Sequence, residues 1–66
     1  MQTYELAYIL KDMYNSATRD KTTMIHLFAI KYAKELQDNN IQLKELLKNA
    51  GMPESYVTEI NKGLRL

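Results

Sequence analysis

Apolar residues recur at helical spacing through the N-terminal half of the 66-residue chain. In the first segment they follow alternating steps of four and three residues, at Leu6, Leu10, Met13 and Ala17. This spacing predicts an amphipathic helix over about residues 3–17. A second helix is expected over about residues 22–38, with Thr22 or Thr23 as its N-cap. Its first turns are apolar on all sides, so we expect it to lie centrally and to be buried on several sides.

The C-terminal third contains two shorter apolar patterns on either side of Gly51. The pattern before the glycine comprises Leu43, Leu46, Leu47 and Ala50, and the pattern after it comprises Met52, Val57 and Ile60. These patterns predict helices over about 42–50 and 54–62, joined as a helix-turn-helix over 42–63. Gly51 is expected to have a positive φ, and Gly63 is expected to end the second helix as its C′ residue. The predicted fold is therefore one all-α domain of four helices over residues 1–66.

The order of residues in this last segment resembles the phage-repressor and Cro type of DNA-binding domain. In that family a leucine-containing helix runs into Ala-Gly, then a hydrophobic residue, then a short helix that ends near a glycine. The matching residues here are Leu46, Ala50, Gly51, Met52, Ser55, Tyr56, Val57, Thr58, Ile60 and Gly63. Asn40 and Ile41 resemble the family's preceding turn, with asparagine, which tolerates the left-handed conformation, in place of a glycine. The resemblance covers about residues 29–63.

The chain also departs from the family pattern at three places. Leu47 stands where the family prefers a small alanine, and Leu43 stands where it often has a glutamine that touches phosphate. The sequence stops three residues after Gly63, so the later helices of the family are missing. We expect the N-terminal helix to replace them in the core, and the alternative is that part of this surface forms a homodimer seam.

The resemblance implies that the second motif helix enters a groove of double-stranded DNA. It places the base-reading residues at Glu54, Ser55, Thr58 and Glu59. It places the phosphate contacts at Lys44, Lys48, Tyr56, Lys62 and Arg65. Asn40 and Gly51 would form the two structural turns. A homodimer on a two-fold site is expected, because a single short helix reads few bases. The implied function is transcriptional regulation.

The charge balance leaves a second class of function open. Nine basic and eight acidic residues give a net charge of +1, without the clear basic patch of a dedicated nucleic-acid binder. A protein-interaction module is therefore the alternative, and Glu54 and Glu59 favour it. Tyr4 and Tyr8 lie one turn apart and could form an exposed pair for a protein partner, although packing at the rim of the core is the preferred interpretation. The apolar residues Leu64 and Leu66 also fit the N-terminal module of a longer polypeptide.

The composition argues against catalysis, cofactors and membrane insertion. The chain has no cysteine, one histidine and only two glycines, so it offers no thiolate metal site and no glycine-rich phosphate loop. His26 lies in an apolar run with no metal ligand at helical spacing, and we expect it to be half-buried and hydrogen-bonded. A pH-sensing role for His26 is the alternative. No apolar run is long enough to span a membrane and no signal peptide is visible, so a cytoplasmic protein that is not an enzyme is expected.

Overall fold

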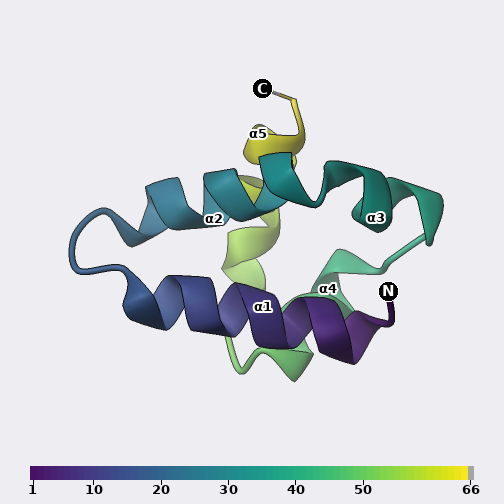
Figure 1. The fold of residues 1–66 in the computed structure, drawn as a ribbon, viewed down its shortest axis with the longest axis horizontal. Helices are drawn as coiled ribbons and strands as arrows, with labels where there is room; N and C mark the ends of the chain where they lie inside the picture. The colour runs from purple at the N-terminus through teal and green to yellow at the C-terminus, as the bar shows by residue number, and fades with distance from the viewer. Residues whose placement is uncertain (66) are drawn as a thin grey trace.

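The computed structural model describes residues 1–65, which are all-helical, without a strand. The elements are α1 (Thr3–Ser16), α2 (Lys21–Lys31), α3 (Ala33–Asp38), α4 (Leu43–Asn49), the short 3-10 helix η1 (Glu54–Tyr56) and α5 (Val57–Leu64), as Figure 1 shows. The first helix and α4 begin and end within one residue of the bounds predicted from the sequence.

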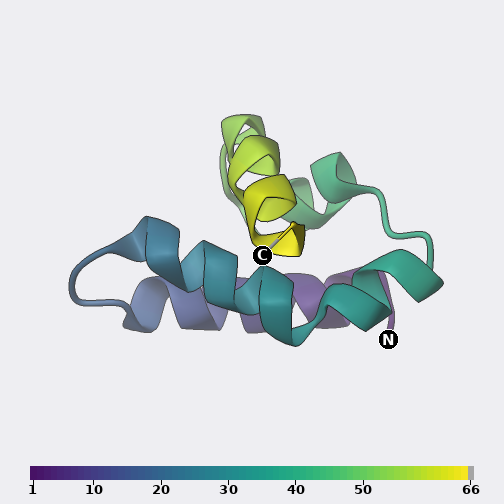
Figure 2. The ribbon, with the colours of Figure 1, turned by 90° about the horizontal axis from the view of Figure 1, so that it is seen from above.

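The helices form two layers. In one layer, α1 and α2 run antiparallel and side by side (Figure 1). Figure 2 shows that α4 and α5 lie together on one side of this pair. The α5 helix packs mainly across α2, while α4 packs on α1. The helix-turn-helix segment is thus held by both helices of the N-terminal half.

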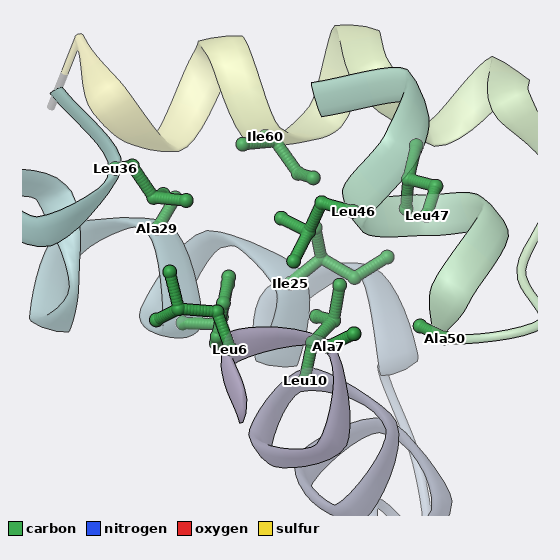
Figure 3. Close-up of a cluster of buried hydrophobic side chains, with 11 residues drawn as sticks. Leu6, Ala7, Leu10, Ile25, Ala29, Leu36, Leu46, Leu47, Ala50 and Ile60 are labelled. Atoms are coloured by element: carbon green, nitrogen blue, oxygen red, sulfur yellow. The ribbon is translucent and has the colours of Figure 1, made fainter. Parts of the chain in front are cut away.

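A single cluster of apolar side chains joins the two layers (Figure 3). Its members are Leu6, Ala7, Leu10, Ile25, Phe28, Ala29, Leu36, Leu46, Leu47, Ala50 and Ile60. Seven of its large side chains are fully buried, and burial of a side chain of this size contributes about 1.5–3 kcal/mol to folding. The core therefore draws on the apolar stripe of every predicted helix.

The second predicted helix, over 22–38, is divided at Tyr32, whose φ of −108° and ψ of 19° lie outside the helical range. Helical hydrogen bonds continue on both sides, from Tyr32 N to Phe28 O and from Leu36 N to Tyr32 O, each 2.9 Å long. The prediction of one uninterrupted helix was wrong. The apolar pattern continues across Tyr32, so the sequence carried no signal for the break.

The start of α2 also differs from the prediction of a threonine cap. Asp20 is the N-cap, and its Oδ1 accepts a hydrogen bond of 3.2 Å from the backbone N–H of Thr23. Its Oδ2 accepts a second bond, of 2.6 Å, from the Thr23 hydroxyl. Both bonds favour the ionised carboxyl and lower the pKa of Asp20. An aspartate accepts both bonds at once, which explains why it caps the helix in place of a threonine.

The expected burial of α2 on several sides is only partly correct. The helix packs against α1 and α5, but Leu27 and Ile30 on its remaining side are each 48% exposed. The second layer contacts only one side of the α1–α2 pair, which explains why the far side of α2 stays open.

Gly63 does not end the last helix as predicted. The α5 helix continues to Leu64, and Gly51 is the glycine with a positive φ. Gly63 is buried inside α5, where it lies against α2, so close packing and not chain reversal accounts for a glycine there. Leu64 packs against the core, whereas Leu66 lies outside the described residues.

Candidate functional site

The candidate site is the helix-turn-helix formed by α4, η1 and α5. The turn after α4 is a Schellman motif, in which Gly51 has a φ of 70°. The Gly51 N–H donates to Lys48 O over 3.1 Å, and the Met52 N–H donates to Leu47 O over 2.9 Å. These two bonds satisfy carbonyl groups at the end of α4 and set the direction of the chain that follows.

The turn that precedes the motif has the same hydrogen-bond pattern. Asn40 has a φ of 53°, and its N–H donates to Gln37 O over 3.3 Å. The Ile41 N–H donates to Leu36 O over 3.1 Å. Asparagine tolerates the left-handed region better than most residues with a side chain, so it takes the place that glycine has in the second turn. Both turns have the geometry expected from Asn40 and Gly51.

The outer side of η1 and α5 carries most of the residues expected to contact DNA. Glu54, Ser55, Thr58, Lys62 and Arg65 are all exposed. On α5 their steps of four and three residues place them on one helical face, opposite the buried Ile60 and Gly63. This exposed side, formed by Glu54, Ser55, Thr58, Asn61, Lys62 and Arg65, is called the outer face below.

Glu59 does not belong to the outer face, although the sequence placed it there. Its Oε1 lies 2.9 Å from His26 Nε2, and its side chain is only 23% exposed. Its Oε2 lies 3.5 Å from Lys62 Nζ. The hydrogen bond with His26, and then the charge of Lys62, outweigh partial burial and lower the pKa of Glu59. Glu59 therefore links α5 to α2 and turns its carboxylate away from the outer face.

His26 has the environment that the sequence predicted. Its side chain is half-buried, and its ring is hydrogen-bonded to Glu59. The bond joins positions 33 residues apart in sequence and fixes the lateral position of α5 on α2.

Tyr56 also points inward, toward α1. Its hydroxyl lies 2.9 Å from the hydroxyl of Tyr14, and the two ring centroids are 5.7 Å apart. This hydrogen bond is the main cause that raises the pKa of Tyr14. Lys21 Nζ donates to Tyr14 O over 2.8 Å and lies 4.6 Å from the centre of the Tyr14 ring. The cluster ties the start of the motif's second helix to α1, so the Tyr56 hydroxyl already has a partner within the fold.

The two lysines of α4 are exposed beside the turn. Lys44 Nζ lies 3.3 Å from Glu54 Oε1, in an ion pair whose two side chains are mostly exposed. A shallow groove there is lined by Lys44, Glu45, Lys48, Met52 and Glu54. Two cations and two anions share this groove, so it has no net charge.

Asn61 is a candidate that the sequence reasoning did not include. It is half-exposed on α5, three residues after Thr58 and four before Arg65. Residues at these separations share a helix face, so the positions of Thr58 and Arg65 were a signal that could have identified it.

The described residues include no group of three or more histidine, aspartate or glutamate side chains placed to hold a metal ion. No helix within residues 1–65 has the length and apolar character needed to cross a bilayer. Tyr4 and Tyr8 are 68% and 74% exposed, so the preferred expectation that they pack at the rim of the core was wrong. The two tyrosines lie on the side of α1 opposite the buried Leu6 and Leu10.

Comparison with known proteins agrees with this geometry. The family model of an HTH-like domain matches residues 2–66, which is nearly the whole chain. Searches of curated proteins and of solved structures gave no match. The family match extends upstream of the motif and takes in α1 and α2, which hold it in place. The chain therefore belongs to the HTH-like domain family, a helix-turn-helix family.

Proposed function

We propose that the protein binds double-stranded DNA in a sequence-specific manner and acts as a transcriptional regulator of the phage-repressor and Cro type. In this proposal the outer face of η1 and α5 enters the major groove, where Ser55 and Thr58 contact base edges. Lys44, Lys48, Lys62 and Arg65 contact phosphates on either side of the groove. The family match over residues 2–66 supports the helix-turn-helix part of the proposal.

The observation that carries the proposal is the inward position of Glu59. From the sequence, two glutamates on the reading helix would each face a phosphate-rich groove. In the structure Glu59 bonds to His26, and the other glutamate, Glu54, is paired with Lys44. Within residues 1–65, Arg65 at the end of the outer face has no ion-pair partner, and Lys62 lies on the same face. The outer face therefore repels the phosphates of DNA less than the net charge of +1 suggests.

We further propose that the protein binds as a homodimer. The α5 helix has eight residues, and one such helix contacts only a few base pairs. Two copies on a two-fold site would double the contacts, with half-sites about one helical turn apart. A footprint at saturation that covers one asymmetric half-site would contradict dimeric binding.

The proposal is tested by measuring affinity for random duplex DNA and for a selected site, at about 50 mM and about 200 mM salt. Lys44→Ala or Lys48→Ala should weaken binding to every sequence about equally. Each should reduce the salt slope by about 0.9 if that lysine contacts a phosphate. Thr58→Ala should instead change the preference at one base position, by about 1 kcal/mol or more. Lys11→Ala, an exposed lysine of α1 outside the motif, is the matched control and should leave both measurements unchanged.

A protein-interaction module is the second candidate, and it is favoured by one observation. Tyr4, Glu5, Tyr8 and Ile9 line a shallow groove on α1, in which two tyrosines are largely exposed. Exposed tyrosines are common at protein interfaces. If the wild-type protein does not bind random duplex DNA at about 50 mM salt, the DNA-binding proposal is rejected and this second candidate becomes the better one.

A further inference from the structure

The side-chain amides of Asn39, Asn49 and Asn61 differ in their hydrogen bonds within the fold. The Asn39 Nδ2 donates to Glu35 O over 3.0 Å, and the Asn49 Nδ2 donates to Glu45 O over 2.7 Å. Each amide donates to a backbone carbonyl four residues earlier, at the C-terminal end of α3 or α4, which is a common structural use of asparagine. These two residues therefore have a role within the fold.

Asn61 has no comparable role. It lies in the middle of α5, and its amide has no hydrogen-bond partner among residues 1–65. No side-chain nitrogen or oxygen in the described residues is both buried and unpaired, so the Asn61 amide reaches solvent. Asparagine is a weak helix former, and an alanine at this position would favour the helix more. The fold itself thus gives no reason for an asparagine here.

The neighbours of Asn61 place its amide on the surface proposed to bind DNA. Thr58 and Arg65 lie three residues before it and four after it, and both are exposed. Residues three apart share a helix face, so Asn61 lies beside Thr58. The hydrogen bond between Glu59 and His26 joins a different side of α5 to α2 and leaves this face open. An amide combines an N–H donor with a carbonyl acceptor. The major-groove edge of adenine presents the complementary pair, the N7 acceptor and the N6 donor.

We infer that Asn61 is a specificity-determining residue of the outer face and that adenine is the base it recognises. The inference rests on the proposed DNA binding and extends it to one residue and one base. The amide nitrogen donates to adenine N7, and the amide oxygen accepts from adenine N6. Thymine, guanine and cytosine each lack one member of this pair in the major groove.

The experiment selects sites from a random duplex library with the wild-type protein and with two variants. The wild-type site should contain an adenine whose replacement lowers affinity by about fivefold to about 150-fold. Asn61→Ala should remove most of this preference and lower affinity for the selected site more than affinity for random duplex. Asn61→Asp has only acceptors and should shift the preference at that position from adenine to cytosine, whose N4 is a donor. Asn15→Ala, an exposed asparagine of α1, is the matched control.

Each outcome has a definite meaning. Thermal melts should show Asn61→Ala to be at least as stable as the wild type, because alanine is the better helix former and the side chain is not buried. If Asn61→Ala binds DNA with unchanged base preferences, the inference about Asn61 is rejected while the proposed function stands. If the wild type does not bind random duplex at about 50 mM salt, both are rejected together.

Discussion

Gly63 of α5 and Ala29 of α2 are in such close contact that there is no room for a methyl group between them. A Cβ atom built on Gly63 would lie 2.6 Å from Ala29 Cβ and 3.0 Å from the carbonyl oxygen of His26. The two helices cross at this point, where each has its smallest side chains. Three residues before Gly63, Ile60 fills the core, and four residues before it, Glu59 bonds to His26. The position of the outer face is set by this crossing.

Gly63→Ala should destabilise the protein by about 1–3 kcal/mol, because the added methyl group must push α5 away from α2. The sign of the change in unfolding free energy distinguishes a close helix crossing from an exposed helix position. In an exposed helix, the same substitution stabilises by roughly 0.5–1 kcal/mol. Urea unfolding of the wild type, of Gly63→Ala and of the exposed control Thr58→Ala measures the difference. A Gly63→Ala protein as stable as the wild type would show that the helices do not cross closely there.

Gly51→Val should cost more than about 1 kcal/mol for a different reason. A Cβ atom at Gly51 meets nothing within 4 Å, so the cost comes from the backbone φ of 70° and not from crowding. Gly51→Asn should cost less, because asparagine adopts this conformation at Asn40 in an equivalent turn. Thermal melts of the two variants compare the costs. Equal destabilisation by valine and asparagine would argue against the left-handed turn as the cause.

The hydrogen bond to His26 makes the stability of the protein sensitive to acid. It lowers the pKa of Glu59 in the folded state, so its contribution is present above the ordinary glutamate pKa of about 4.3. That contribution is lost as the pH falls through the lowered, folded-state pKa. Glu59→Gln should therefore be less stable than the wild type at pH 7, and the difference should shrink in acid.

Unfolding measured from pH 7 to pH 2 tests this expectation for Glu59. Glu45→Gln, at an exposed glutamate of α4, is the control and should follow the wild-type curve. Asp20 also has a lowered pKa, so part of the acid sensitivity should remain in Glu59→Gln. A difference between Glu59→Gln and wild type that does not change with pH would contradict a role for the ionised carboxylate.

Glu54→Gln should strengthen binding to random duplex DNA. The substitution breaks the ion pair with Lys44, which is then free to contact a phosphate. Because an exposed ion pair is worth at most about 1 kcal/mol, the gain should be up to roughly fivefold, with a steeper salt dependence. Glu35→Gln changes the net charge equally but lies on α3, outside the motif, and serves as the control. Weaker binding by Glu54→Gln would indicate that this carboxylate contacts DNA directly.

The periodicity of apolar residues determined most of the fold. Leu46, Leu47 and Ala50 before the turn, and Ile60 after it, are all buried as their spacing predicts. Gly51 and Asn40 were identifiable because few residue types adopt a positive φ without strain. These features depend on neighbours within a few positions, so the local sequence contains the information.

The tertiary structure decided which polar residues remain available to a ligand. Glu59 and Tyr56 lie on the same helical segment as Thr58 and Ser55. Their sequence spacing does not indicate that the first two side chains are hydrogen-bonded within the fold while the other two face solvent. Their partners, His26 and Tyr14, lie 33 and 42 residues away, on α2 and α1. Gly63 was likewise taken for a helix end, because only the crossing with Ala29 reveals why a glycine is needed. Local periodicity determined the helices and their buried sides, whereas long-range hydrogen bonds and close packing determined the composition of the outer face.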